Sequence, residues 1–225
     1  MYDERRSLTR ALKQHIEGLR AFGLSAVPAA RSPYHAPEAA ESPLERLARE
    51  VAACQRCPLY RTATQGVVSD GAPAARLMFV GEAPGCDEDL QGKPFVGAAG
   101  QLLTKMIEAM GMKREQVYIC NVLKHRPPGN RVPLPEEIDA CFPYLQEQIN
   151  VVRPKVICTL GAVATKALLG PYVSITKVRG ELREYQGTLL VPTFHPAYLL
   201  RNPPAKKFAW EDLKKVKKLL EASDE

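Results

Sequence analysis

Three short apolar runs divide the central part of the chain, and helical patterns separate them. The runs end in loops that contain Gly, Asn or Pro, and they lie at residues 76–80, 117–122 and 156–160. Apolar residues recur every three or four positions in three further segments, which predicts helices at 100–110, 135–152 and 162–169. This alternation predicts an α/β fold with a parallel sheet and helices on both faces. In such sheets the ligand lies beyond the carboxyl ends of the strands.

Shorter patterns flank this central part. A short helix is expected at 44–53, before the first strand. Residues 180–185 and 188–192 resemble a hairpin that leads into the last strand. The pattern at 206–222 predicts an amphipathic terminal helix with many lysines on one face.

The N-terminal segment differs from the rest of the chain. A helical pattern precedes Gly23 and consists of Leu8, Leu12, His15, Ile16 and Leu19. The residues after Gly23 are rich in Ala, Pro and Ser, which is typical of a linker. We therefore separate an N-terminal helix and linker at 1–42 from a domain at 43–225.

The composition is that of an ordinary globular protein. Of the 225 residues, 45% are hydrophobic and 25% are charged, which argues against collagen, a continuous coiled coil and wholesale disorder. No stretch of about 18 uncharged apolar residues occurs, so we expect no membrane span. The charged N-terminus lacks the apolar stretch of a signal peptide, and we therefore expect a cytoplasmic protein.

The net charge of +6 is a mild basic excess that suits a phosphate-bearing partner. The chain also has six cysteines and no export signal, so we expect metal or cluster ligands together with buried thiols. Cys54 and Cys57 form a Cys-x2-Cys pair, and Cys141 lies far along the chain. Such a pair suits zinc or an iron–sulfur cluster. A thioredoxin-like redox pair is disfavoured because this pair follows a helix and precedes Pro58, and Cys158 is expected to be a buried thiol in an apolar strand.

The segment GEAPGCDED, residues 81–89, directly follows a predicted strand. Small residues such as Ala83 and Gly85 allow backbone N–H groups to approach a ligand closely. The acidic side chains, among them Glu82 and Glu88, would repel phosphate and instead suit a developing cation or an oriented water molecule. The alternative is a solvated acidic turn.

His195 ends the last predicted strand, and Pro196 after it restricts its direction. A histidine in this place is able to donate a hydrogen bond to a carbonyl group. Tyr198, Leu199 and Leu200 follow as an apolar group that suits a wedge in a base stack. The alternative is a buried structural histidine.

Seven motifs occur in order over about residues 50–203: CPLY after the Cys-x2-Cys pair, GEAPGxxED, GKPFVGAAGQLL, KxRPPGNR, ICTLGAVAT, KVRG and HPAYLLR. Together they resemble the family 4 uracil-DNA glycosylases, the iron–sulfur branch of that superfamily. The resemblance covers most of the domain and none of residues 1–42. It implies a single α/β domain with a central four-stranded, mostly parallel sheet flanked by helices, a 4Fe–4S cluster, and excision of uracil from DNA.

The resemblance also implies how the base is recognised. Phe95 would stack on the flipped uracil, Asn121 would bind its polar edge, and His195 would contact the O2 side. Uracil presents an N3–H donor and an O4 acceptor, whereas cytosine presents an acceptor and an amino group. One Asn amide matches uracil twice and mismatches cytosine twice, and each unmet buried group costs about 1–3 kcal/mol.

The catalytic roles follow from the same resemblance. Backbone amides from Glu82 to Gly85, including that of Ala83, would line the pocket and stabilise the departing uracil anion together with His195. A carboxylate, Glu82 or Glu88, would favour the cationic sugar or position the attacking water, and the sequence leaves open which of the two matters more.

One cluster position departs from the family pattern. The family has a third cysteine in a KCRPP segment, 16 residues before the fourth, and this chain has His125 there, 16 residues before Cys141. We therefore expect Cys54, Cys57, His125 and Cys141 to be the ligands of the cluster. Cys120 is the alternative fourth ligand, although it lies within a strand directly before Asn121.

A related branch also has His at this position and traps uracil-DNA covalently through a second His in an inserted basic loop. The residues between His125 and Cys141 contain no His and no insertion, so we expect ordinary turnover. No Lys is placed in the pocket motifs for a Schiff base, which predicts a monofunctional glycosylase without lyase activity. Two alternatives are a protein that binds uracil-DNA without turnover and an iron–sulfur electron carrier.

The expected partner is uracil-containing DNA, single- or double-stranded. Arg126, Arg131 and Arg201 are candidates for phosphate contacts, and the alternative for the first two is a solvated loop. We expect a monomer whose activity is associated with the nucleoid, and the helix within 1–42 is a candidate site for a repair partner.

Overall fold

The computed structural model of the protein describes residues 10, 13–18, 20–21 and 41–222. The chain divides into two units, residues 1–40 and 41–225. The described residues of the first unit are helical, and they include His15 and Ile16. The other positions of the predicted N-terminal pattern and the linker lie outside the described residues, and the boundary between 42 and 43 stays a prediction.

The second unit is built on a mixed sheet of six strands in the order β1-β3-β2-β4-β6-β5. The strands are β1 (Ser69–Gly71), β2 (Leu77–Gly81), β3 (Tyr118–Asn121), β4 (Val156–Leu160), β5 (Arg183–Tyr185) and β6 (Thr188–Thr193). The central four, β3, β2, β4 and β6, run parallel, and β1 and β5 pair antiparallel at the two edges. The predicted α/β fold with a parallel four-stranded centre is confirmed, as is the hairpin of β5 and β6.

Residues of the central strands alternate between two cores. Met78, Val80, Cys120 and Ile157 face one core, and the residues next to them in sequence, such as Phe79, face the other. Every residue of β2, β3 and β4 is buried, because helices cover both faces. The continuous apolar runs of the sequence have this origin.

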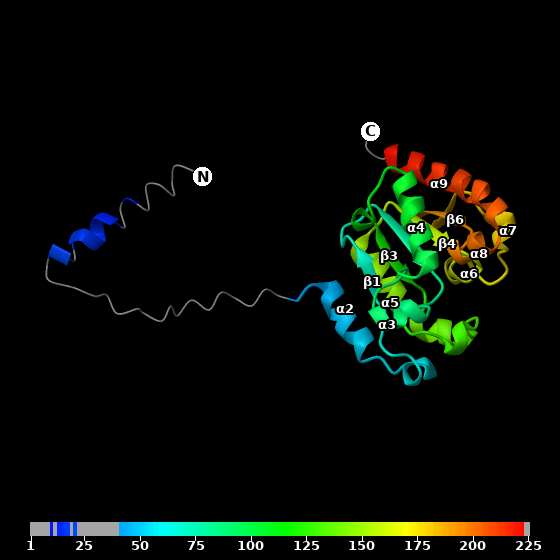
Figure 1. Ribbon diagram of the computed structural model, residues 1–225, viewed down its shortest axis with the longest axis horizontal. Coiled ribbons are helices and arrows are strands. Elements are labelled where there is room, and N and C mark those ends of the chain that lie inside the picture. Colours follow the sequence, from blue (N-terminus) through cyan, green and yellow to red (C-terminus); the bar gives the residue numbers. More distant parts are fainter. Residues whose placement is uncertain (1–9, 11–12, 19, 22–40, 223–225) are drawn as a thin grey trace. The chain divides into compact units, whose positions relative to one another are not determined.

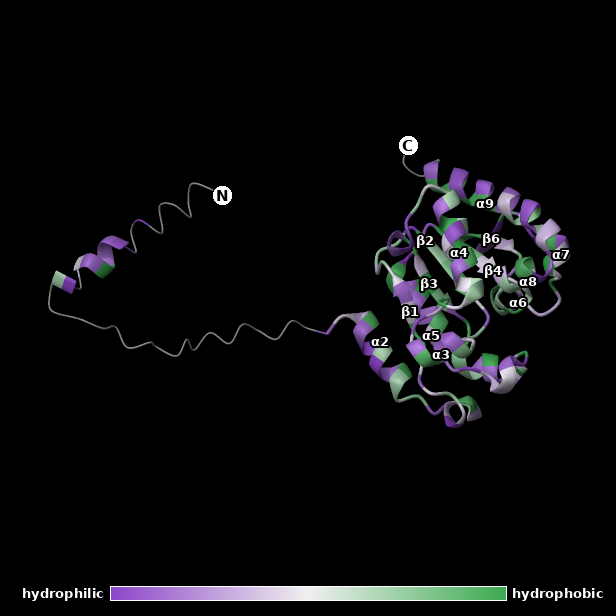
Figure 2. Ribbon diagram, viewed as in Figure 1, coloured by the Kyte–Doolittle hydropathy of each residue, from purple (hydrophilic) through white to green (hydrophobic). Residues whose placement is uncertain are grey.

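Helices cover both faces of the sheet (Figure 1). The longer ones are α2 (Pro43–Ala52), α4 (Ala98–Ala109), α5 (Pro135–Val152), α6 (Ala162–Leu169) and α9 (Lys206–Glu221). All five were expected within two residues of these bounds at each end. The first core contains side chains of α2, α5 and α6, and the second contains those of α4 and α9. Figure 2 shows hydrophilic residues along the outer side of α9, as the amphipathic pattern predicts.

The helix ends follow from local sequence. The hydroxyl of Ser42 accepts a hydrogen bond from the N–H of Glu45 (3.3 Å), whose carboxylate accepts one from the N–H of Ser42 (2.8 Å). Proline occupies the first turn of both α2 and α5, where no N–H is needed. The short helices were not expected from periodicity: α3 (Cys86–Gln91), α7 (Ile175–Val178), α8 (Pro196–Arg201), and the 3₁₀ turns η1 (Pro58–Arg61), η2 (Arg114–Gln116), η3 (Pro128–Asn130) and η4 (Pro203–Ala205).

Within the described residues, we find no helix with the length and apolar character needed to cross a membrane. The carboxyl ends of β2, β3 and β6 lie along one edge of the sheet, and the three motif segments around residues 82, 121 and 195 begin there.

Candidate active site

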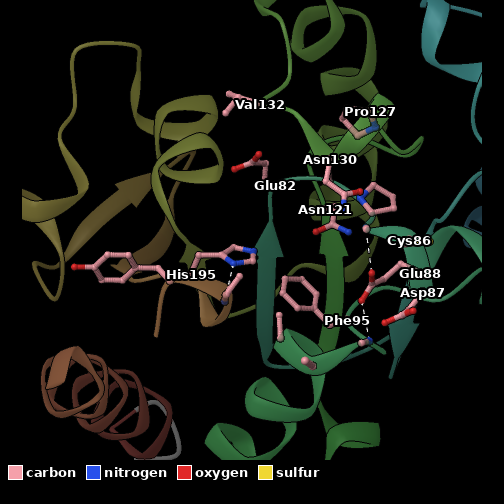
Figure 3. A pocket seen from close by; sticks show the side chains of 18 of the residues that line it. Glu82, Cys86, Asp87, Glu88, Phe95, Asn121, Pro127, Asn130, Val132 and His195 are labelled. Carbon is pink, nitrogen blue, oxygen red and sulfur yellow. Dashed lines mark hydrogen bonds between the residues drawn. The ribbon is translucent and has the colours of Figure 1, made fainter. Parts of the chain in front are cut away.

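A cavity of about 580 Å³ opens at the carboxyl ends of the parallel strands. Its walls come from the loop after β2, the start of α3, the segment before α4, the end of β3, the loop around η3, and the start of α8 (Figure 3). The polar and aromatic residues that line it include Glu82, Glu88, Phe95, Asn121, Asn130, Arg131, His195, Tyr198 and Arg201. Most of the residues singled out in the sequence are therefore brought together.

Asn121 is the last residue of β3 and is only 2% exposed. No described residue donates a hydrogen bond to its buried Oδ1 atom. An unpaired buried acceptor of this kind costs about 1–3 kcal/mol, so buried polar atoms are rarely left without a partner. The Asn121 amide is therefore prepared for a ligand that donates a hydrogen bond.

Gly81 gives the Asn121 side chain its space. The two residues are paired across β2 and β3. A Cβ atom on Gly81 would overlap both Oδ1 of Asn121 and the ring of Phe95. The absence of a side chain at the end of β2 thus allows the amide and the aromatic ring to face one cavity.

Phe95 is held in an unusual backbone conformation, with φ at +54°. Its ring is buried, and the ring centroid lies 5.6 Å from that of His195. Gly100 in the first turn of α4 packs directly against the Phe95 backbone, where no Cβ atom would fit. A left-handed backbone conformation at a residue other than glycine costs about 1–3 kcal/mol and persists only where the surrounding structure enforces it. Such strained residues are common at ligand sites.

The two glutamates of the acidic motif differ in their partners. The Glu88 carboxylate accepts three backbone hydrogen bonds, from the N–H groups of Gly85 (3.1 Å), Val96 (2.9 Å) and Gly97 (3.0 Å). It thereby joins the loop after β2 to the segment that carries Phe95 (Figure 3).

Glu82 lines the same cavity, and no described residue forms a hydrogen bond with its carboxylate. Burial raises the pKa of Glu82 above its ordinary value. The structure thus leaves one carboxylate free in the cavity and uses the other to tie two loops.

His195 is the N-cap residue of α8, and its Nδ1 accepts a hydrogen bond from the N–H of Ala197 (3.1 Å). Burial and, to a smaller extent, the nearby Arg201 lower the pKa of His195 to about 4, although Glu88 opposes the shift. The imidazole is therefore neutral at pH 7, and since Nδ1 accepts, its proton lies on Nε2. The site has a neutral donor rather than a cation at this position.

The predicted DNA-contact residues occupy different environments. Tyr198 and Arg201 line the cavity mouth and are exposed, whereas Leu199 is 1% exposed and packs with Ala205 and Ala209. The structure therefore does not bring Leu199 to the surface, because successive residues of α8 point in different directions.

The arginines of the KxRPPGNR motif are both engaged by protein groups. Arg131 binds the buried carboxylate of Glu137 through two nitrogens (2.6 and 2.8 Å). Arg126 donates to Oδ1 of Asn130 (2.8 Å). The loop that they stabilise lines the cavity through Pro127, Asn130 and Val132, a role that the sequence analysis did not assign. The Pro-Pro-Gly-Asn string was its signal, since such a string marks a turn with a specified shape.

A second cluster of chemical groups lies on the α5 side of the sheet. Cys54, Cys57 and Cys141 are free thiols; Cys54 and Cys141 lie in the first core, and Cys57 is half-buried against it. Burial raises the pKa of Cys141 to about 11; Lys124 opposes this shift, and the neighbouring thiols of Cys57 and Cys54 add to it. The backbone N–H of Lys124 donates to Sγ of Cys141 (3.2 Å).

The remaining candidate ligands lie nearby in the chain. His125 is buried, and burial lowers its pKa while Asp89 opposes that shift. Cys120 is fully buried in β3 and faces the same core as Cys141. In the described part of the chain, no three His, Cys, Asp or Glu side chains are arranged as a metal site. Cys158 is buried in β4 as expected, and Cys86 is exposed at the start of α3.

Comparison with known proteins shows the family to which the chain is similar. Residues 68–214 match the profile of the Uracil DNA glycosylase superfamily. The chain is 48% identical over 185 residues to the Type-4 uracil-DNA glycosylase of Sulfurisphaera tokodaii, covering 78% of this chain and 84% of that protein. It is 46% identical over 184 residues to the Type-4 uracil-DNA glycosylase of Thermotoga maritima, covering 80% and 96%. A Type-5 uracil-DNA glycosylase of Pyrobaculum aerophilum is 31% identical over 145 residues.

Proposed function

This chain belongs to the uracil DNA glycosylase superfamily, and we propose that it excises uracil from DNA by hydrolysing the N-glycosidic bond. The observation that carries this function is the buried, unpaired Oδ1 of Asn121 in a cavity large enough for a nucleobase. Oδ1 accepts the N3–H of uracil, and the amide nitrogen of the same side chain donates to O4. Cytosine has an unprotonated N3 and an amino group at these positions, so both contacts would fail.

Access to the bond requires that the base leave the duplex. Extrusion of a base costs a few kcal/mol, which contacts in the pocket must offset. Phe95 supplies an aromatic surface for stacking, and its strained backbone keeps the ring in place before the base arrives. Tyr198, which lines the cavity and is exposed, contacts the DNA strand that carries the extruded base.

Cleavage breaks the bond between C1′ of the sugar and N1 of uracil, and the electron pair stays on the base. The negative charge is delocalised onto O2, where the Nε2–H of neutral His195 donates a hydrogen bond. Backbone N–H groups of Ala83 and Gly85 add to the same stabilisation. A neutral imidazole suits this role, because with a pKa of about 4 an imidazolium at this position would already have lost its proton at pH 7.

The sugar is left with a developing positive charge, which Glu82 stabilises across the cavity. Water then adds to C1′ and Glu82 accepts its proton, which it returns to solvent; the uracil anion takes a proton from solvent, and the products are free uracil and an abasic site. Glu88 is a positioning residue in this scheme, since three backbone donors already occupy its carboxylate.

The chemistry of the cysteine site fits an iron–sulfur cluster. Cys54 and Cys141 are buried, Cys57 is half-buried beside them, and burial raises the pKa of Cys57 and Cys141, which disfavours their thiolates unless a cation compensates them. Cys54, Cys57 and Cys141 would hold the cluster, with His125 as the fourth ligand in place of a thiolate. When bound, the cluster would supply a cross-link between the end of α2 and α5, and hydrolysis of the glycosidic bond needs no electron from it.

The test uses an oligonucleotide with one uracil placed opposite G, opposite A, or in a single strand. One half of each reaction is heated in alkali and run on a sequencing gel, and the other half is run on a denaturing protein gel. We expect alkali-dependent strand cleavage over many turnovers and no protein–DNA adduct. The Asn121→Ala variant should lose about a hundredfold in kcat/KM, because two hydrogen bonds to the base are removed.

Other outcomes have defined meanings. A protein–DNA band that survives denaturation would assign the chain to the trapping branch. Binding without cleavage or adduct would favour a non-catalytic uracil-DNA binder, and an absence of both signals from iron-loaded protein would overturn the proposed substrate.

A further inference from the structure

Lys124 is a fully buried lysine that the steps above do not use. Its side chain is 0% exposed, and Nζ donates to the backbone carbonyl oxygen of Asn121 (2.6 Å) and to Oε1 of Gln148 (2.6 Å). A buried ammonium group is costly to desolvate and is retained only where its surroundings compensate it. The group is bonded to the backbone of Asn121, the residue proposed to bind the base, which suggests why a buried lysine is kept here.

Gln148 extends the contact into the sheet. Its Nε2 donates to Oη of Tyr118 (3.0 Å) and to the carbonyl oxygen of Val68 (3.0 Å). Tyr118 is the first residue of β3 and Asn121 is the last. Lys124 thus binds the last residue of β3 and Gln148 binds the first, and both contacts restrict the strand that carries the Asn121 amide.

The same lysine contacts the cysteine site through its backbone. Its N–H donates to Sγ of Cys141 (3.2 Å). Cys141 and Gln148 are both buried residues of α5, separated by seven positions or about two helical turns, so they lie on one face of that helix. Lys124 thus joins a residue of the cysteine site to a residue of the base pocket directly.

The surroundings of Lys124 lack an ordinary counter-ion. No carboxylate of the described residues forms an ion pair with its ammonium group, and the acidic groups that act on it are the thiols of Cys120 and Cys141. The hydrogen bonds from Nζ to Asn121 and Gln148 are therefore the contacts that hold this side chain.

We propose that Lys124 is a positioning residue that couples the cysteine site to uracil recognition, an inference that rests on the proposed function. Its side chain holds the Asn121 carbonyl and so orients the Asn121 amide, and its hydrogen bonds to Asn121 and Gln148 fix the backbone whose N–H donates to Sγ of Cys141. Loss of the lysine therefore weakens base recognition and cluster retention together.

The test compares Lys124→Met with Lys214→Met, which removes an exposed lysine of α9 and serves as the matched control. Two probes separate base recognition from DNA binding: free uracil as an inhibitor, and an oligonucleotide with a stable abasic site as a ligand. In K124M we expect the inhibition constant for uracil to rise about tenfold or more, with affinity for abasic DNA within about twofold of wild type. K214M should match wild type for both probes.

A second readout follows the cluster. Iron and sulfide content and the decay of visible absorbance in air are measured for both variants, and we expect faster decay in K124M alone. Should K124M fail to fold, Gln148→Leu takes its place, since it removes one acceptor of the ammonium group and leaves the lysine. The same selective loss of uracil affinity is expected there.

Several results would overturn the inference. Unchanged uracil inhibition in K124M, or an equal loss of affinity for uracil and abasic DNA, would remove the positioning role. Unchanged cluster decay would remove the coupling to the cysteine site. Wild-type protein that leaves uracil in DNA would overturn the proposed function itself, and this outcome is separate because it needs no variant.

Discussion

The base pocket and the cysteine site are both joined to the segment that follows β3, yet they are ordered by different means. In the pocket, backbone N–H groups hold the carboxylate of Glu88 and the imidazole of His195, while Asn121 Oδ1 and the Glu82 carboxylate are left free. In the cysteine site, burial raises the pKa of Cys57 and Cys141, and Sγ of Cys141 accepts one backbone hydrogen bond, from Lys124. The pocket is organised by the chain itself, whereas under the proposed function we expect the cysteine site to depend on the cluster that it would hold.

This difference predicts opposite responses to substitution. A change to a free group in the pocket should reduce activity and leave stability almost intact, because that group supports no other part of the fold. A change to a cysteine ligand should reduce stability more than activity.

The largest expected effect is that of Glu82→Gln. The variant keeps the shape of the side chain and removes the carboxylate that stabilises the sugar cation, so we expect the single-turnover rate to fall about 10²–10⁴-fold. The melting temperature should stay the same or rise slightly, because burial of the charged form is no longer required.

Glu88→Gln is the matched control for that variant. It removes acceptors for backbone donors, so we expect the free energy of unfolding to fall by about 1–3 kcal/mol, with a smaller loss of rate than in Glu82→Gln. Full activity in Glu82→Gln together with an inactive but stable Glu88→Gln would reverse the two assignments.

Cys57→Ala tests the other region. We expect loss of iron and a decrease of about 3 kcal/mol in the free energy of unfolding, because binding of a structural metal group contributes to folding. Cys86→Ala removes an exposed thiol and should change neither quantity. A stable, colourless and fully active Cys57→Ala protein would contradict a structural role for the cluster.

Gly81→Ala should break the simple separation between the regions. The added Cβ atom overlaps the Asn121 amide and the Phe95 ring, so both must move. We expect a destabilisation of about 1–3 kcal/mol and a loss of uracil excision in the same variant. Wild-type kinetics and an unchanged melting temperature would show that the cavity wall yields more easily than its packing indicates.

The smallest effect concerns pH. The pKa of His195 is lowered to about 4, so it should stay neutral from pH 8 to pH 5.5, and its protonation should not reduce the rate there. In the unfolded chain a histidine binds its proton near pH 6.5, which means that the unfolded state gains protons first as the pH falls.

Stability should therefore decrease between about pH 6.5 and pH 4 while this histidine still supports catalysis. The acidic decline of the rate belongs to Glu82, whose pKa lies above its ordinary value. Rates from single turnovers and unfolding by urea at each pH check both statements. A loss of activity centred near pH 6.5 that disappears in His195→Gln would contradict them.

Much of the fold followed from local patterns. Each of the apolar runs at 76–80, 117–122 and 156–160 matches a strand of the central sheet to within one residue at each end, and the helices at 135–152 and 162–169 have the expected bounds. The edge strand β1 was missed because it has only three residues, Ser69–Gly71, and they form no apolar run. It belongs to the sheet through its antiparallel pairing with β3.

The candidate site was predicted in part. The motifs predicted that Glu82, Phe95, Asn121 and His195 share one pocket, and all four line the cavity at the carboxyl ends of the parallel strands. Leu199 was expected to face DNA and is instead buried against α9. Packing decides which side chains of the six-residue helix α8 face the protein and which face solvent, and the motif alone carries no information on that packing.

The sequence by itself determined the alternation of strands and helices, the parallel centre of the sheet, and the identity of the residues at its carboxyl edge, because these depend on periodicity over a few neighbouring positions. The tertiary structure alone decided that Glu88 is tied and Glu82 free, that Asn121 Oδ1 has no partner, and that Lys124 lies between pocket and cysteines. The physical reason is that hydrogen-bond partners and burial depend on atoms brought together from distant parts of the chain, as Lys124 and Gln148 are, 24 positions apart.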